Sequence, residues 1–141
     1  MVVVLVIGIL LAVGIPTYLG ARKRAHDRAA QTDLMSALDT AAVVLIDNGD
    51  VGTTDAQLEA IEPSLDFAWQ GDVDDGQISW RDGGVNSQEI WFATRSKSGD
   101  CFHLRWTISG GNAGVAYASE PNPTSCRIAN YTGPLTWSDS W

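Results

Sequence analysis

Charged side chains are absent from the first 21 residues, and basic side chains are scarce in everything that follows residue 28. Residues 1–28 carry a net charge of +3, from one acidic side chain, Asp27, and four basic ones, Arg22, Lys23, Arg24 and Arg28. The remaining residues hold five basic and sixteen acidic side chains, a net charge of −11. Because so acidic a surface repels phosphate backbones, nucleic acid would bind it only through local patches.

Catalytic and metal-binding patterns are also lacking. The sequence has no Ser-His-Asp arrangement, no phosphate-binding loop and no isolated reactive cysteine. Its two histidines, His26 and His103, have no third ligand at a metal-like spacing, and we expect His103 on the surface of a strand. The acidic run at 71–76 suggests calcium, but its spacing does not fit an EF-hand, and we interpret it as a solvated loop. We expect no enzymatic activity, cofactor, metal site or small-molecule substrate.

The charge-free run at the N-terminus is apolar on all sides. As a helix, its 21 residues would be about 32 Å long, close to the hydrocarbon thickness of a bilayer. A signal peptide would need a basic lead-in, and a buried core helix is usually shorter and striped. The run therefore predicts a membrane-spanning segment.

The compartment of the remaining chain is indicated by two opposing signals. The Arg-Lys-Arg cluster that follows the apolar run would place the rest of the chain in the cytoplasm by the positive-inside rule. Cys101 and Cys126 indicate an oxidising compartment, because two cysteines in a small domain usually pair there. We give the cysteines more weight, since the rule needs both flanks of the span.

The apolar run continues into an amphipathic helix. Small and apolar residues recur at steps of three and four as far as Ile46, with charged residues mostly between them. The pattern predicts that the helix ends at Asn48-Gly49, where glycine suits the left-handed residue that closes a helix. An element of 48 residues would be about 70 Å long, more than a chain of this size can bury, so we expect half of it to protrude.

Beyond residue 48 the sequence predicts a small α+β domain. A capping box at 54–57 begins a short helix over 55–61, which ends before Pro63. Four β-rich runs follow, at 77–80, 89–94, 101–108 and 114–119, separated by turn residues. Alternation in the third run predicts that Phe102, Leu104, Trp106 and Ile108 face the helix. We expect a four-stranded antiparallel sheet packed on the C-terminal half of the long helix.

The N-terminal sequence MVVVLVIGILLAVGIPTYLGARKRAHDRAAQTDLMSAL resembles the first helix of type IV pilins and of pseudopilins. Gly8, Gly14, Pro16 and Tyr18 occupy the corresponding places, and the likeness covers residues 1–48 most strongly. The layout is most similar to pilins of high-GC Gram-positive bacteria. Aligning Pro16 places the glutamate typical of the family just before Met1, with about six mature residues and a leader upstream.

The resemblance implies three segments: a membrane or filament-core segment (1–24), an amphipathic half (25–48) and a globular head with a disulfide-closed C-terminal loop (49–141). The residues expected to pack in the filament core are Val4, Leu5, Ile7, Leu10, Leu11 and Ile15. In such filaments the segment 8–15 is expected to lose its helical form around Gly8, Gly14 and Pro16; a simple kink is the alternative. The inter-subunit charges, which alternatively contact lipid headgroups before assembly, are Arg22, Lys23, Arg24 and Arg28.

Four further predictions concern the head: its disulfide, a glycosylation sequon, the C-terminal stretch and the exposed tryptophans. Cys101 and Cys126 enclose 24 residues, and a disulfide between them would stabilise the domain by roughly 3 kcal/mol; two buried free thiols are the alternative. Asn130 begins a glycosylation sequon. The C-terminal stretch LTWSDSW is expected to fold back as a last strand or to lie on a neighbour. Of six tryptophans, those expected to be exposed are Trp91, Trp137 and Trp141.

These observations predict a structural subunit of an extracellular helical filament, a type IV pilus. The resemblance implies a methylated N-terminus, a precursor held in the inner or cytoplasmic membrane, extraction by a pilus assembly machinery, and a homo-oligomer on the cell surface that supports adhesion, motility or DNA uptake. A pseudopilin of a secretion or competence system is one alternative. The other is a monomeric membrane-anchored binding protein or adhesin, which would have a continuous span and form no polymer.

Overall fold

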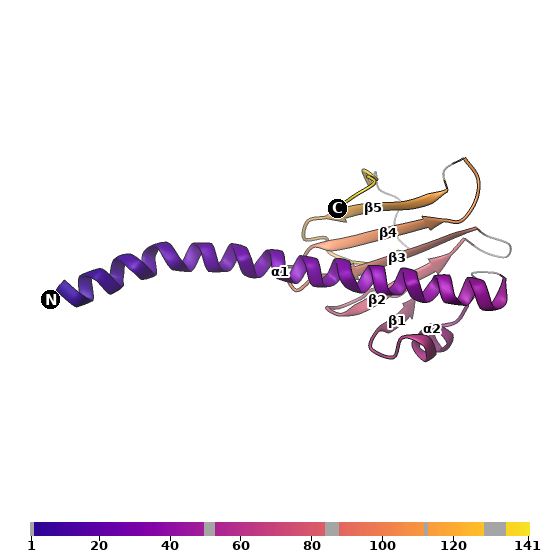
Figure 1. Ribbon diagram of the computed structural model, residues 1–141, viewed down its shortest axis with the longest axis horizontal. Coiled ribbons are helices and arrows are strands. Elements are labelled where there is room, and N and C mark those ends of the chain that lie inside the picture. The colour runs from indigo at the N-terminus through magenta and orange to yellow at the C-terminus, as the bar shows by residue number, and fades with distance from the viewer. Residues whose placement is uncertain (1, 50–52, 84–87, 112, 129–134) are drawn as a thin grey trace.

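The protein consists of one long helix that carries a small head at its C-terminal half (Figure 1). The computed structural model describes residues 2–49, 53–83, 88–111, 113–128 and 135–141, apart from a few side chains in the first turns of the helix. Helix α1 spans Val2–Asn48. Figure 1 shows it as one gently curved helix whose N-terminal half projects beyond the head. The expected long, half-protruding helix is therefore present.

Helix α1 ends where the sequence predicts. Gly49 adopts the left-handed conformation at φ 75°, and its N–H donates to the Leu45 carbonyl at 2.8 Å. Glycine is favoured there because it has no Cβ to clash in this region. The segment 8–15 is helical in the single chain. Its expected unwinding concerns the assembled filament and stays a prediction.

The short helix α2 spans Asp55–Ile61, as predicted. Its capping box is formed in both directions: the Gln57 N–H donates to Thr54 Oγ1 at 3.4 Å, and the Thr54 N–H donates to Gln57 Oε1 at 3.0 Å. Leu58 is the buried residue of this helix and joins the core. The Thr54 N–H is thereby satisfied, and the Gln57 N–H, which also donates to the Thr54 carbonyl at 3.0 Å, gains a second acceptor; together these bonds fix where so short a helix begins.

The sheet has five strands and is mixed, which corrects the expectation of four antiparallel ones. The strands are β1 (Asp66–Trp69), β2 (Gln77–Asp82), β3 (Glu89–Arg95), β4 (Cys101–Thr107) and β5 (Gly114–Glu120), in the spatial order β1-β2-β3-β4-β5. Strand β1 pairs with β2 in parallel, and the other neighbours are antiparallel. The four predicted strands are the antiparallel ones, and β1 was missed.

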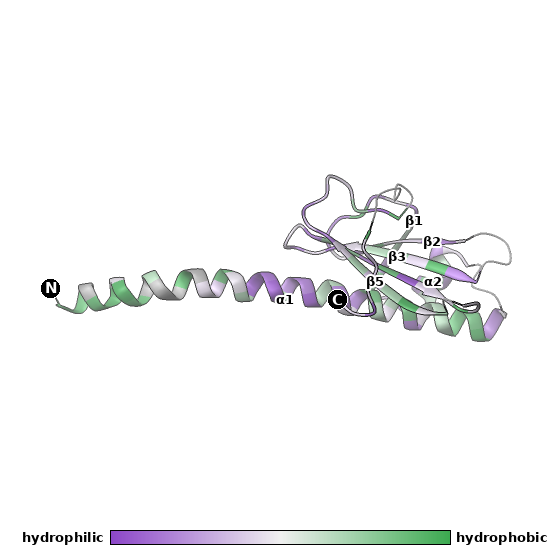
Figure 2. Cartoon of the chain, turned by 90° about the horizontal axis from the view of Figure 1, so that it is seen from above, coloured by the Kyte–Doolittle hydropathy of each residue, from purple (hydrophilic) through white to green (hydrophobic). Residues whose placement is uncertain are grey.

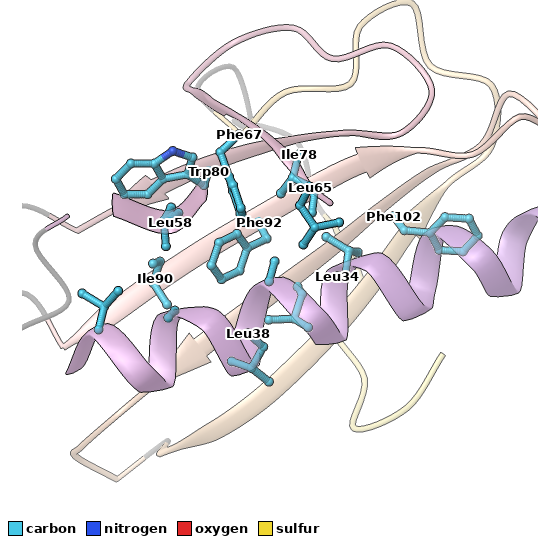
Figure 3. Close-up of a cluster of buried hydrophobic side chains, with 14 of the residues drawn as sticks. Leu34, Leu38, Leu58, Leu65, Phe67, Ile78, Trp80, Ile90, Phe92 and Phe102 are labelled. Carbon is cyan, nitrogen blue, oxygen red and sulfur yellow. The ribbon is translucent and has the colours of Figure 1, made fainter. Parts of the chain in front are cut away.

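The main core lies between the C-terminal half of α1 and one face of the sheet (Figure 3). Leu34, Leu38 and neighbouring alanines of α1 pack against residues that alternate along the strands: Ile78, Trp80, Ile90, Phe92, Phe102 and Leu104. Trp106 packs at the edge of this cluster. The alternation predicted for β4 is thus confirmed within the strand; Ile108 lies just beyond its end.

The opposite face of the sheet is covered by the segment that the disulfide holds. Cys101 and Cys126 are bonded, with their Cα atoms 5.6 Å apart, so the free-thiol alternative is wrong. Val73, Ala93 and Ile128 complete a second buried cluster around this bond. Bonds from main-chain N–H groups to side-chain oxygens hold the segment on the sheet: the Cys126 N–H donates to Asp72 Oδ1 at 2.8 Å, and the Ile128 N–H to Ser79 Oγ at 3.2 Å. The sheet is therefore buried on both faces over part of its area.

This second layer corrects the expectation for His103. The residue was predicted on the surface of a strand, but it is buried, with 1% of its surface exposed. It lies in β4 between Ala93 of β3 and Ala118 of β5. Burial lowers its pKa to about 4, because a charged imidazolium loses its hydration there.

The C-terminal segment crosses the outer edge of the sheet. Ser138 forms an isolated antiparallel bridge with Tyr117 of β5, through two N–H to carbonyl bonds of 2.9 Å. The predicted last strand is therefore reduced to one residue pair among the described residues. The ring of Trp141 packs on Phe102 and Tyr117, whose side chains face α1.

Candidate functional site

The projecting half of α1 presents a continuous apolar surface to solvent. Its exposed apolar side chains retain between 47% and 74% of their surface: Val2, Val3, Val4, Val6, Ile7, Ile9, Leu10, Ile15, Tyr18 and Leu19. Figure 2 shows this apolar stretch, followed by a hydrophilic band where the helix approaches the head. Contiguous exposed apolar surface of this extent marks a site of protein or membrane contact.

The predicted filament-core residues lie on this surface as far as the structure describes them. Val4, Ile7, Leu10 and Ile15 are exposed. The structure does not describe the surroundings of the other predicted residues in this segment, which are Leu5, Leu11, Gly14 and Pro16. A Cβ placed on Gly8 would meet nothing within 4 Å, so this glycine is not required by packing within the single chain.

Helix α1 is long and apolar enough to cross a membrane. The segment Thr17–Asn48 meets this criterion by length and composition. Part of that segment is buried against the sheet, whereas the charge-free residues before it whose side chains are described are exposed. A signal sequence and the core helix of a soluble domain pass the same test, so the finding supports a membrane anchor only weakly.

The four basic residues after the apolar run are exposed, and the structure distinguishes them. Lys23 Nζ lies 3.1 Å from Asp100 Oδ2 of the same chain. Arg22 donates through Nε to His26 Nε2 at 3.3 Å. Within the described residues, Arg22, Arg24 and Arg28 form no ion pair with a carboxylate. Three of the four predicted inter-subunit charges are therefore free to meet acidic groups of another chain, while Lys23 is engaged internally.

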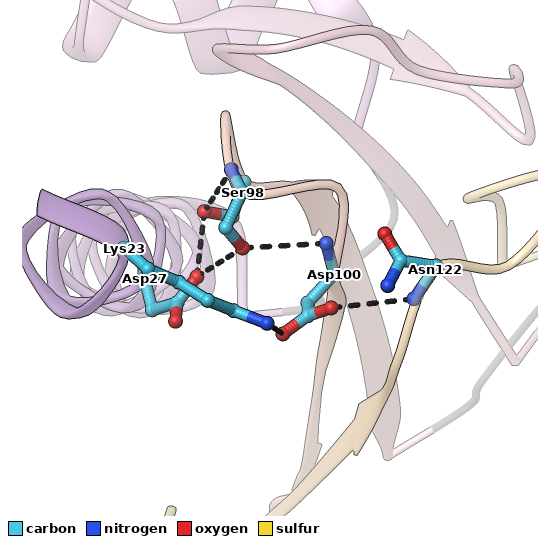
Figure 4. A network of polar contacts seen from close by, with 6 residues as sticks. Lys23, Asp27, Ser98, Asp100 and Asn122 are labelled. Atoms are coloured by element: carbon cyan, nitrogen blue, oxygen red, sulfur yellow. Dashed lines mark hydrogen bonds and ion pairs between the residues drawn. The ribbon is translucent and has the colours of Figure 1, made fainter. Parts of the chain in front are cut away.

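A polar network fastens α1 to the turn between β3 and β4 (Figure 4). Asp27 Oδ1 accepts hydrogen bonds from the hydroxyl groups of Ser96, at 2.8 Å, and Ser98. Asp100 accepts a bond from the Asn122 N–H at 3.3 Å as well as pairing with Lys23. Because Lys23 and Asp27 are four residues apart, they lie on one face of the helix. The network holds the helix at the level where it leaves the head.

Sequence reasoning missed this junction. Asp27 is the one acidic residue among the first 28. The sequence indicates only that its negative charge partly cancels the positive charge of the basic cluster. Its partners lie about 70 residues away in the chain, in the turn Ser96–Asp100. A serine at alternate positions of a turn is common, so nothing local indicated that these hydroxyls would meet the helix.

Two of the three tryptophans expected to be exposed are half-buried. Trp91 and Trp137 meet edge to face, with ring centres 5.6 Å apart, on the sheet face opposite α1. Arg105 lies against both rings. Trp141 is exposed by 40%. The expectation was wrong for Trp91 and Trp137, because each ring covers part of the other and both rings contact the Arg105 guanidinium.

The acidic loop at 71–76 has a structural role. Asp72 accepts the Cys126 N–H, and the Val73 N–H donates to the Cys126 carbonyl at 3.1 Å. Asp75 forms an isolated parallel bridge with Arg95. In the described part of the chain, no group of three His, Cys, Asp or Glu side chains is placed to hold a metal ion. The sequon at Asn130 lies outside the described residues.

Comparison with known protein families, with curated proteins and with solved structures gave no significant match. The site is therefore interpreted from its own residues: an exposed apolar helix, four exposed basic side chains of which three have no ion pair among the described residues, and a hydrogen-bonded junction to an acidic head.

Proposed function

We propose that the protein is the structural subunit of a helical filament of the type IV pilus kind. One observation carries this proposal: the apolar half of α1 is fully formed as a helix yet has no partner among the described residues of its own chain. A surface of this kind needs a bilayer, a second copy, or each in turn. A filament subunit uses both in turn, because its apolar helix lies in the bilayer before assembly and against other copies after it.

The apolar helix supplies the main association energy. Fully burying one aliphatic side chain contributes about 1.5–3 kcal/mol. Nine exposed aliphatic residues precede residue 20, and each is already partly covered by its own helix, so burial is worth on the order of 10 kcal/mol per subunit. A bilayer and a bundle of like helices offer similar burial, so transfer from one to the other costs little and an assembly machinery can drive it.

Charge complements this association. Arg22, Arg24 and Arg28 are exposed and without ion pairs in the described chain, next to the apolar surface. The acidic residues that give residues 29–141 a net charge of −11 can meet them on neighbouring subunits. A contact between different surfaces of identical chains does not close on itself, and it therefore generates a helix of indefinite length.

The proposal is tested on the native protein. Surface filaments are sheared from cells and inspected by electron microscopy, and the N-terminal peptide is read by mass spectrometry. A filament-associated chain with an N-methylated N-terminal residue is the expected result. A chain that stays in the membrane fraction as a monomer, with an unmethylated N-terminus, would contradict it.

One observation favours the anchored monomer as a second candidate. Helix α1 runs without interruption through 8–15, as a simple membrane span would. The two candidates differ in what the triple variant Arg22→Gln, Arg24→Gln, Arg28→Gln does. It should abolish or shorten filaments if the free arginines join subunits, and it should leave the membrane fraction of an anchored monomer unchanged.

A further inference from the structure

A row of alternating basic and aromatic side chains crosses the sheet on the face opposite α1. Arg81 of β2 lies opposite Trp91 of β3, which lies opposite Arg105 of β4. The guanidinium carbons of Arg81 and Arg105 are 5.6 and 5.5 Å from the centre of the Trp91 ring. Trp137 extends the row, because its ring centre lies 4.9 Å from the Arg105 guanidinium carbon. We call these four residues the Arg-Trp row.

The Arg-Trp row offers positive charge and hydrogen-bond donors without matching acceptors. In the described chain neither Arg81 nor Arg105 forms an ion pair. The Nε atom of Arg105 and the Nε1 atom of Trp91 are buried and have no hydrogen-bond partner. Buried donors normally have one, so each unpaired donor requires an explanation. At Arg105, which lines the hollow described next, an oxyanion would provide it, since a carboxylate accepts several bonds from one guanidinium.

A hollow of about 300 Å³ adjoins the row at Arg105 and Trp137. Its other polar side-chain groups are the carboxylate of Asp139 and the hydroxyls of Thr107 and Ser138. These hydroxyls donate to Glu89 Oε1 and to the Ser140 carbonyl, and each can still accept a bond. Hydroxyl and carboxylate groups exchange hydrogen bonds with sugar hydroxyls, and the flat apolar face of an indole fits the C–H face of a pyranose ring. The hollow thus adds sugar-compatible groups to the oxyanion-compatible row.

We propose that the Arg-Trp row and this hollow bind an acidic glycan. A uronate carboxylate pairs with the Arg105 guanidinium, the sugar ring lies on Trp137, and Asp139 accepts from a hydroxyl of the same or the next sugar. The carboxylate of Asp139 in the hollow favours a sugar over a nucleic acid, because it accepts hydrogen bonds from hydroxyl groups and repels a phosphate backbone. This inference does not depend on filament assembly.

The test measures binding of three uronate oligosaccharides, from hyaluronan, alginate and polygalacturonate, to the full chain in a nonionic detergent by calorimetry. At least one is expected to bind, and its carboxyl-reduced form is expected to bind about 10-fold more weakly or worse, because each charge-assisted bond is worth about that factor. Acetate should compete only weakly, since it lacks the sugar ring. Failure of all three oligosaccharides to bind at millimolar uronate would overturn the proposal.

Variants locate the site. Arg105→Gln and Trp137→Ala are each expected to weaken binding about 10-fold, whereas Lys97→Gln, which removes the same charge from an exposed turn residue, should change it less than twofold. If Arg105→Gln lowers the melting temperature, Arg81→Gln at the end of the row carries the test. Equal losses in Arg105→Gln and Lys97→Gln would show non-specific attraction and refute the site. Equally tight binding of single-stranded DNA would refute the sugar as its ligand.

Discussion

The stability of the head should depend on pH through His103. Burial lowers the pKa of this imidazole to about 4 in the folded protein, against an ordinary value of 6.5. Between these values the unfolded chain binds a proton that the folded chain does not, so the stabilisation is complete above pH 6.5 and is lost as pH falls toward 4. The full shift corresponds to roughly 3 kcal/mol, and about 1 kcal/mol of it is lost between pH 7.5 and 5.5.

Urea unfolding of the full chain in a nonionic detergent, followed by tryptophan fluorescence at pH 7.5 and 5.5, measures this loss. The variant His103→Gln removes the titration, and His26→Gln removes the other imidazole, which is only half-buried. We expect the pH difference to shrink by about 1 kcal/mol in His103→Gln and to persist in His26→Gln. A wild type and a His103→Gln variant with the same pH difference would refute the reasoning, whatever the absolute stability of the variant.

Three further predictions concern the core, the junction and the disulfide. Leu34→Ala should lower the free energy of unfolding by about 3–5 kcal/mol, because Leu34 is fully buried between α1 and the sheet; urea midpoints measure it. Asp27→Ala should cost about 1.5–3 kcal/mol by leaving two turn hydroxyls without their acceptor, whereas Asp39→Ala, on an exposed position, should cost less than about 0.5 kcal/mol. Replacing both cysteines by serine should lower stability by roughly 3 kcal/mol, and a thermal midpoint that does not move would contradict this.

Local signals in the sequence were sufficient for the elements that local chemistry defines. The capping box placed α2 at its observed bounds, since its bonds join residues three apart. Turn residues placed each antiparallel strand to within two residues, because each pairs with the next along the chain. The apolar and amphipathic halves of α1 followed from periodicity, and the helix end followed from Gly49.

The features that were missed depend on contacts distant in sequence. Strand β1 is four residues long with Phe67 as its buried residue, too short to show alternation, and its parallel partner is not joined to it by a hairpin. The burial of His103 depends on the segment that Cys126 brings over the sheet. The Asp27 junction likewise needs the folded turn. Periodicity identifies which face of a strand is apolar, but not what covers the other face.

The one-residue pairing of the C-terminal segment with β5 protects part of an edge of the sheet. Strand β5 is an edge strand, and unpaired edges are templates for aggregation when identical sheets come close together. Ser138 occupies the middle of this edge at Tyr117, with Trp137 against the face opposite α1 and Trp141 against the face toward it. The two rings therefore lie on opposite faces of the sheet beside β5. At Tyr117 the backbone groups of the edge are therefore already paired and cannot accept a strand of another sheet.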